Sequence, residues 1–368
     1  FRPKFKICHG FILKTDVQFS IYRSAINTIL YCVFLFSVTG IMLEMTIGIL
    51  HQLDLNKQLK GPIKYFYSRY YRHVYAQTRN IMNYQEDCTK YDDYLYYTLR
   101  PGSCIFKNEE FDTRLYINSL GLRDDEKSIE NPNVIFLGDS HTMGWGVEQE
   151  EVFPQIFEKI TGLRTLNGGV TSYGTIRELM LLEKIDLQEV KYVFIQYSPN
   201  DWRENKKFFE EGVLKIGSQN KFNTRIQKYE NDKKYYLGMY SNIFLKLIWQ
   251  KFNSKLKTLN HKDNAFIAQS NEAKHVLNAL KKKSIDSLGP KFIIFSIGVY
   301  NKNDPKFINE LSALLKESSL DKVISTVDIS NIFNDEDYFT LDAHINVKGH
   351  QKVAEFLSSI YFQKNNQS

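Results

Sequence analysis

Four short segments of this chain carry residues that could together perform acyl transfer. They are "GDS", which contains Ser140, "NGG", which contains Gly169, "PND", which contains Asn200, and "DAH", which contains Asp342 and His344. A serine hydroxyl is a weak nucleophile until a base removes its proton, and a histidine oriented by a carboxylate can be that base. We therefore predict that Ser140 attacks an acyl carbon, that His344 takes the Ser140 proton, and that Asp342 orients the imidazole.

The intermediate of acyl transfer carries an oxyanion, which needs hydrogen-bond donors aimed at it. The backbone N–H groups of Ser140 and Gly169 and the side-chain amide of Asn200 are the candidate donors. His141 and Asp201 flank these positions and are candidate substrate contacts, with a structural role as the alternative for His141. Each segment alone is weak evidence, because Gly-Asp-Ser and Asn-Asp also form ordinary turns and helix caps.

The elements that must position these residues alternate between strand and helix. Five apolar runs predict strands, at 134–140, 164–169, 192–198, 291–298 and 323–330, and amphipathic runs predict helices at 153–162, 175–185, 307–317 and 347–362. Such alternation is typical of a parallel sheet with helices on both faces, a three-layer α/β/α sandwich. Ligands bind at the carboxyl ends of the strands in such sheets, which is where the four segments lie. The pattern Gly-x-Ser-x-Gly is absent because residue 142 is Thr, which argues against an α/β-hydrolase.

The rest of the chain divides by composition. We predict a helical stalk over 51–80, a β-rich lead-in segment over 81–130 that packs on the main domain, and the main domain over 131–362, followed by a tail over 363–368. A lysine-rich, mostly helical stretch over 203–288 interrupts the main domain between its third and fourth strands. We interpret this stretch as an insertion or lid.

Residues 25–43 form a run of 19 residues without a charge. A helix needs about 20 apolar residues to cross a bilayer, so we predict a transmembrane helix over 25–50, with a buried core helix as the alternative. The basic segment 1–24 before the run and Glu44 after it predict a cytoplasmic N-terminus. The remaining chain would lie outside the cytoplasmic (inner) membrane, in the periplasmic or extracytoplasmic space. Because the first residue is Phe, we expect further residues to precede it.

The cysteines and the net charge limit the kinds of metal site and binding partner that the sequence predicts. Cys88 and Cys104 would lie in the oxidising compartment and could form a disulfide or remain two buried thiols. Their spacing predicts no zinc or other metal site. The net charge is +6, but no nucleic-acid-binding module accompanies the basic region, so we expect no nucleic-acid partner. A solvated basic face near an anionic membrane or polysaccharide explains that charge better.

Longer stretches around the four segments resemble the blocks of the SGNH (GDSL-type) hydrolase superfamily. They are "GDSHTMGWGV", "NGGVTSYGT", "SPND" and "LDAHINVKGHQKVAEFL". The stretch 101–126 also resembles the segment before this domain in membrane-anchored relatives. The resemblance implies a flavodoxin-like α/β/α fold and Ser-His-Asp chemistry without a metal or cofactor. One departure concerns the acid: the commonest spacing would place it at Leu341, so Asp342 represents a variant and Asp337 is a distant alternative.

The resemblance also implies a function. We expect a membrane-tethered serine O-acyl esterase or O-acetyltransferase that acts on an extracytoplasmic glycan through an acyl-serine intermediate. Its partners would be an acyl-glycan or acyl donor, the lipid bilayer and a multi-pass membrane acyltransferase or another membrane assembly. The alternative is a structural or scaffolding component of such an assembly that retains the fold, and a lipase is a third option.

Overall fold

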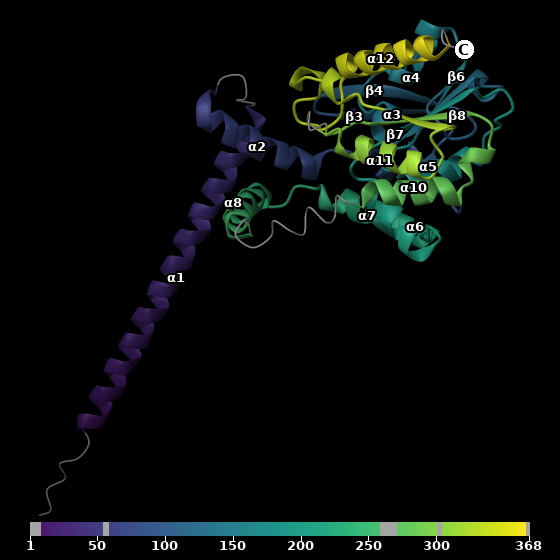
Figure 1. Cartoon of the computed structure of the whole chain (residues 1–368). Coiled ribbons are helices and arrows are strands. Elements are labelled where there is room, and N and C mark those ends of the chain that lie inside the picture. The colour runs from purple at the N-terminus through teal and green to yellow at the C-terminus, as the bar shows by residue number, and fades with distance from the viewer. Residues whose placement is uncertain (1–8, 54–58, 258–270, 300–303, 366–368) are drawn as a thin grey trace, which may run out of the picture. The chain divides into compact units, whose positions relative to one another are not determined.

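The computed structural model describes residues 9–53, 59–257, 271–299 and 304–365 (Figure 1). The chain divides into two compact units. The helical unit comprises Phe1–Val74 and Tyr235–Leu256, and the α/β unit comprises Tyr75–Lys234 and Lys257–Ser368. The division places the end of the predicted stalk in the α/β unit and the middle of the predicted insertion in the helical unit.

A five-stranded parallel sheet forms the centre of the α/β unit. Its strands are β5 (Val134–Gly138), β6 (Thr165–Gly169), β7 (Tyr192–Tyr197), β8 (Lys291–Ser296) and β9 (Ile324–Val327). They lie in the order β6-β5-β7-β8-β9, so the first strand of the sheet has the second on one side and the third on the other. This is the flavodoxin-like order, in which the chain changes direction between β5 and β7 and opens a crevice at their carboxyl ends.

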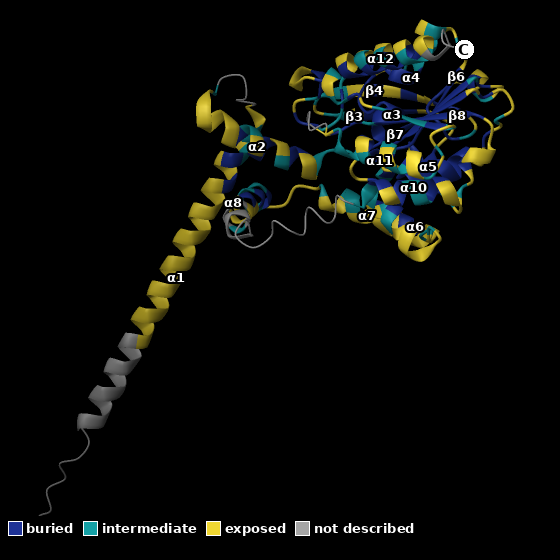
Figure 2. Ribbon diagram, viewed as in Figure 1, coloured by how far each residue is buried: buried dark blue, intermediate teal, exposed yellow. Residues whose placement is uncertain are grey.

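Alternate residues of each strand enter two separate cores, as the pleat of a strand requires. Ile135, Val193 and Ile294 face one core, whereas Phe136 and Phe194 face the other. The fully buried strands are apolar on both faces because helices cover both sides of the sheet (Figures 1 and 2). The covering helices are α4 (Phe153–Thr161) and α12 (Val347–Asn365) on one face, and α5 (Thr175–Leu182), α10 (Glu272–Lys282) and α11 (Lys306–Glu317) on the other. The three-layer α/β/α prediction is confirmed.

The lead-in segment forms two antiparallel hairpins in the α/β unit. The first pairs β1 (Thr89–Asp92) with β2 (Tyr96–Leu99), and the second pairs β3 (Gly102–Asn108) with β4 (Phe111–Ile117). Phe106 and Leu115 of the second hairpin share a small core with Met143 and Trp145, which follow the predicted nucleophile. The lead-in segment therefore packs directly beside the candidate site.

The described part of the stretch 203–288 is mostly helical and belongs largely to the α/β unit. Its helices are α6 (Trp202–Glu211), α7 (Gln219–Asp232), α8 (Met239–Lys257) and α10. Phe208 of α6, Phe222 of α7 and Val276 of α10 belong to one sheet-facing core, so these helices are part of the α/β unit. Within this stretch, residues 235–256, which include α8 up to Leu256, belong to the helical unit.

The helical unit consists of α1 (His9–Gln52), α2 (Gly61–Thr78) up to Val74, and α8. Its small core joins Ile47 of α1, Tyr70 of α2, and Ile243 and Leu247 of α8. The stretch Tyr22–Gln52 of α1 is long and apolar enough to cross a membrane, and little of it is buried (Figure 2). It contains the predicted transmembrane range.

Candidate active site

Ser140 lies just after the carboxyl end of β5, the strand that pairs with β7. It is the first residue of the short helix α3 (Ser140–Met143), and Asp139 caps this helix by accepting a hydrogen bond of 3.0 Å from the His141 N–H. Gly144 ends α3 with a φ of +90°, in the left-handed region that favours glycine. This sharp strand-to-helix turn explains why glycines and short polar residues follow the apolar strand.

A continuous hydrogen-bond chain joins the three predicted catalytic residues. The Oγ of Ser140 lies 2.7 Å from Nε2 of His344. The Nδ1 of His344 lies 2.5 Å from Oδ1 of Asp342. This is the arrangement in which an imidazole can take the serine proton while the carboxylate holds the ring and stabilises its charged form.

Asp342 is fully buried and receives three further hydrogen bonds on its second oxygen. Its Oδ2 accepts from the Tyr75 hydroxyl at 2.8 Å, from Arg79 Nη1 at 2.7 Å and from Trp145 Nε1 at 3.1 Å. Burial alone would raise the pKa of Asp342, but His344, Arg79 and the Tyr75 hydrogen bond outweigh burial and hold the pKa well below its ordinary value. The carboxylate is therefore charged at any pH at which the protein would act.

Glu110 holds the backbone of the same loop. Its carboxylate, at the turn of the second hairpin, accepts hydrogen bonds from three consecutive N–H groups, at 2.7 Å from Thr340, 2.8 Å from Leu341 and 3.0 Å from Asp342. Three charge-assisted hydrogen bonds to adjacent residues fix both the position and the direction of a loop. Glu110 thus fixes the position of the loop that carries the catalytic carboxylate of Asp342.

Arg123 holds the loop that follows the nucleophile. Its guanidinium is fully buried and donates to the carbonyl oxygens of Met143, Gly144 and Val147 and to the Gln149 side chain. Burial lowers the pKa of Arg123 to about 10, so the group still carries its charge at neutral pH. The carbonyl oxygens therefore help to compensate the buried charge of Arg123.

Two rings enclose His344. The Trp145 ring stacks on it with centroids 4.5 Å apart, and the His141 ring lies 4.9 Å away. Burial lowers the pKa of His141 to about 4, so His141 is neutral at neutral pH and adds no charge beside His344. Ser140 is 7% exposed and the His344 side chain is 13% exposed, so both are largely but not completely shielded from solvent.

The three predicted oxyanion donors differ in their surroundings and in their hydrogen-bond partners. The Ser140 N–H is at the first position of α3, where N–H groups have no acceptor within the helix, so it can serve. Asn200 is exposed in the turn after β7, the strand next to β5. Gly169 does not present a free donor, because its N–H donates to Oδ1 of Asn167 at 3.0 Å. A Cβ at Gly169 would lie 2.2 Å from the Met143 nitrogen, so this glycine is required for close packing of α3.

The two predicted substrate contacts, His141 and Asp201, are both buried. His141 is 2% exposed and Asp201 is 1% exposed, so neither side chain is open to a substrate. Asp201 instead accepts hydrogen bonds of 3.4 Å from Thr175 and from the Ser198 N–H, which closes the turn after β7. Burial and the neighbouring carboxyl groups, Glu178 first, raise the pKa of Asp201 well above its ordinary value. Asp201 is a structural residue.

The alternative acid, Asp337, has other partners. Its Oδ2 lies 2.6 Å from Lys352 Nζ and accepts a hydrogen bond of 2.6 Å from the Asn334 N–H. Asp342, rather than Asp337, contacts His344. Cys88 and Cys104 are joined by a disulfide in the core of the lead-in segment. Among the described residues, no group of three or more His, Cys, Asp or Glu side chains could hold a metal ion.

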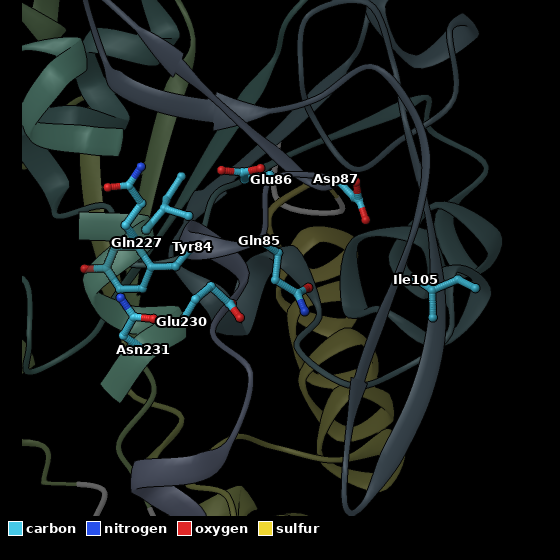
Figure 3. A pocket seen from close by; sticks show the side chains of 9 residues that line it. Tyr84, Gln85, Glu86, Asp87, Ile105, Gln227, Glu230 and Asn231 are labelled. Atoms are coloured by element: carbon cyan, nitrogen blue, oxygen red, sulfur yellow. The ribbon is translucent and has the colours of Figure 1, made fainter. Parts of the chain in front are cut away.

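A separate cavity of about 440 Å³ lies beside the lead-in segment and α7 (Figure 3). Its lining is mostly polar and consists of Tyr84, Gln85, Glu86, Asp87, Ile105, Ile226, Gln227, Glu230 and Asn231. None of the predicted catalytic or oxyanion residues belongs to this lining.

Five residues that support the site were not predicted: Tyr75, Arg79, Glu110, Arg123 and Trp145. Glu110 and Arg123 lie in the stretch 101–126, whose resemblance to membrane-anchored relatives was the only available signal. Trp145 lies within the first motif, where its role could not be separated from that of its neighbours. Tyr75 and Arg79 lie in the predicted stalk, where aromatic and basic residues are so frequent that no single one stands out.

Comparisons with known proteins give likeness at the level of structure. No protein-family model matches the chain, and no curated protein matches it. A protein provisionally described as lipolytic and of the G-D-S-L family, from Desulfitobacterium hafniense DCB-2, is 13% identical with a TM-score of 0.34, and the match covers 62% of this chain and 99% of that one. A member of the lipolytic G-D-S-L family from Veillonella parvula DSM 2008 is 14% identical with a TM-score of 0.32, over 60% of this chain and 93% of that one.

A carbohydrate esterase, described as having divergent catalytic and non-catalytic binding functions at its active site, is 12% identical with a TM-score of 0.36. That match covers 63% of this chain and 69% of the esterase. Because all of these TM-scores are below 0.5, the fold assignment rests on the strand order and the site geometry of this chain. On those grounds the α/β unit is a flavodoxin-like α/β/α sandwich that carries a Ser-His-Asp hydrogen-bond chain at the carboxyl end of β5.

Proposed function

We propose that this protein is a membrane-tethered serine O-acyl esterase or O-acetyltransferase that acts on an extracytoplasmic glycan. The observation that carries the proposal is the hydrogen-bond chain from Ser140 through His344 to Asp342. These hydrogen bonds support an esterase-type function, because they join a nucleophile to the base that activates it.

The first half of the reaction follows from the geometry. Ser140 Oγ attacks the acyl carbon while its proton moves to His344 Nε2, and the carbonyl oxygen becomes an oxyanion beside the Ser140 N–H. The intermediate collapses, and the bond to the leaving alcohol breaks as His344 Nε2 returns the proton to that alcohol. An acyl ester on Ser140 remains.

In the second half, His344 Nε2 takes a proton from water or from a sugar hydroxyl, and the oxygen of that group attacks the acyl carbon. The bond between Ser140 Oγ and the acyl carbon then breaks as His344 Nε2 returns the proton to Oγ. Water as the acceptor gives an acid and a free enzyme, whereas a sugar hydroxyl gives a new O-acyl glycan. The apolar helix α1 supports tethering to a membrane, and the Cys88–Cys104 disulfide supports an oxidising, extracytoplasmic location for the α/β unit.

The test is acetyl release from p-nitrophenyl acetate by the full chain in detergent micelles, beside its Ser140→Ala variant. Each protein is also treated with a fluorophosphonate, which forms a covalent bond to an activated serine Oγ. We expect turnover and labelling in the wild type and neither in the variant. Equal turnover in the two proteins, together with no labelling of the wild type, would remove the catalytic proposal.

A second arm separates the two reaction types. The wild type is given p-nitrophenyl acetate with and without a xylo-oligosaccharide, and the products are analysed by mass spectrometry. An acetylated sugar that depends on Ser140 indicates transfer, and acetate alone indicates hydrolysis.

A further inference from the structure

The start of α8 is attached to α1 by a buried carboxylate. Glu44 of α1 is 2% exposed and accepts hydrogen bonds of 3.0 Å from the Tyr240 N–H and 2.7 Å from the Ser241 N–H, both in the first turn of α8. The Ser241 hydroxyl donates to the same carboxylate at 2.7 Å. A carboxylate satisfies the free N–H groups at a helix N-terminus and interacts favourably with the helix dipole. The beginning of α8 is thus fixed to α1 at residue 44.

That attachment point is also where the uncharged stretch of α1 ends. Residues 25–43 carry no charge, and at 1.5 Å per residue they span about 28 Å, close to the thickness of the hydrocarbon core of a bilayer. Glu44 follows at once, so a bilayer crossed by this stretch places the start of α8 at the boundary between hydrocarbon and headgroups. In Figure 1, α1 is seen from the side and α8 nearly along its axis, so α8 runs across α1.

Two faces of α8 are apolar, and they differ in how far their side chains are buried. Met239, Ile243 and Leu247 recur every four residues and are buried in the core of the helical unit. Leu245, Ile248 and Trp249 lie on a different face, which we call the α8 face, and are 59%, 46% and 64% exposed. An exposed apolar face that contains tryptophan suits the bilayer interface, where amphipathic aromatic rings are favoured.

The charge of α8 and the composition of the neighbouring helix α2 are consistent with that location. The sequence of α8 contains four lysines and no acidic residue. The sequence of α2 also lacks acidic residues, and its first turns expose Ile63, Tyr65 and Phe66. Basic helices with apolar and aromatic side chains bind anionic lipid surfaces through both charge and buried apolar area.

We propose that the α8 face lies in the headgroup–acyl interface of an anionic bilayer, in the leaflet at the Glu44 end of α1, so that the chain is held by α1 and by α8 together. A second copy of the chain or another protein on this face would be a different occupant. The proposal rests on α1 spanning a bilayer and does not depend on the catalytic function.

The test uses the fluorescence of Trp249 in the full chain, reconstituted in phosphatidylcholine–phosphatidylglycerol vesicles. The lipids carry bromine on the acyl chains, either near the headgroup or near the chain end, because bromine quenches tryptophan at short range. The protein has three tryptophans, so the Trp249 contribution is the emission lost in Trp249→Phe, and Trp202→Phe is the matched control. We expect the lipids brominated near the headgroup to quench the Trp249 emission more than those brominated at the chain end, and Trp202→Phe to retain this quenching.

Bromolipid quenching that is the same in the wild type and in Trp249→Phe would overturn the proposal. So would quenching of the Trp249 emission by iodide, which stays in water, and so would protection from both quenchers, which would mean that protein covers the face. A final arm replaces the phosphatidylglycerol with phosphatidylcholine. We expect less bromolipid quenching there, and an unchanged value would overturn the part of the proposal that concerns anionic lipid.

Discussion

Arg79 donates a hydrogen bond of 2.7 Å to the buried oxygen Oδ2 of Asp342, although 263 positions separate the two residues in the chain. The Tyr75 hydroxyl reaches the same oxygen. The α/β sandwich supplies the nucleophile, the base and the acid, while residues that precede the sandwich hold the acid in place. The segment before the first strand of the sheet is therefore part of the active site.

Replacing the acid should distinguish the two aspartates that were candidates from sequence. Asp342→Asn removes the charge that stabilises the His344 imidazolium, and we expect kcat to fall by a factor on the order of 10⁴. Asp337→Asn is the matched control, because Asp337 pairs with Lys352 and does not contact His344. Its kcat on p-nitrophenyl acetate should remain close to that of the wild type. The reverse order of the two effects would assign the acid to Asp337.

Removing the support of the acid should lower kcat without changing KM. Arg79→Met deletes a charge-assisted hydrogen bond to Asp342, and such a bond contributes about 1.5–3 kcal/mol, which corresponds to roughly 10-fold to 100-fold in rate. Tyr75→Phe deletes a single hydroxyl and should have a smaller effect in the same direction. Asp342 is fully buried and cannot touch substrate, so KM should be unchanged. A rise in KM at constant kcat would instead place Arg79 in substrate binding.

The hairpin that carries Glu110 offers a second test of positioning. Glu110→Ala removes the acceptor of three consecutive N–H groups, and we expect the loop with Asp342 to lose its fixed position. The rate of fluorophosphonate labelling at Ser140 should fall by about 10-fold or more, since the loss of one charged hydrogen bond already costs about 1.5–3 kcal/mol. Asp112→Asn in the same hairpin is the control, because Asp112 is exposed and pairs with the exposed Lys107. Equal labelling rates in the two variants would contradict the role of Glu110.

The buried His141 should make the protein less stable in acid. Its pKa is lowered by burial to about 4, whereas an unfolded histidine has its ordinary value of 6.5. Between these values the unfolded chain binds the proton and the folded chain does not, so stability falls as the pH decreases from 6.5 to 4. At about 1.4 kcal/mol per pKa unit, the loss amounts to about 3 kcal/mol.

The measurement is the free energy of unfolding from urea titrations at several pH values, for the wild type and His141→Gln. Glutamine does not titrate, so the difference between the two proteins should shift in favour of the variant as the pH falls through this range. A difference that stays constant with pH would show that His141 keeps an ordinary pKa in the folded protein.

Much of the fold could be predicted because it depends on local patterns. The strands β5, β7 and β8 are largely apolar on both faces, and the helices between the strands have one apolar side, so their order along the chain implies a parallel sheet covered on both faces. The catalytic residues could be predicted because each lies at the end of a strand or before the last helix. The role of Gly169 could not be predicted, since whether an N–H is free depends on which side chain lies next to it, and here Asn167 does. In the same way, only the folded chain shows that the carboxylate of Asp201 accepts hydrogen bonds from Thr175 and Ser198.

By itself, the sequence determined the α/β/α layers, the apolar helix before them, and Ser140, Asp342 and His344 as residues whose types suit acyl transfer. Periodicity and short motifs are local properties, so they can be recognised in the amino-acid sequence alone. Only the tertiary structure decided that Tyr75, Arg79, Glu110 and Arg123 hold the site and that α8 is fixed to α1 through Glu44. These are contacts between residues far apart in the chain, and they exist only when packing brings a buried charge to the one group that can compensate it.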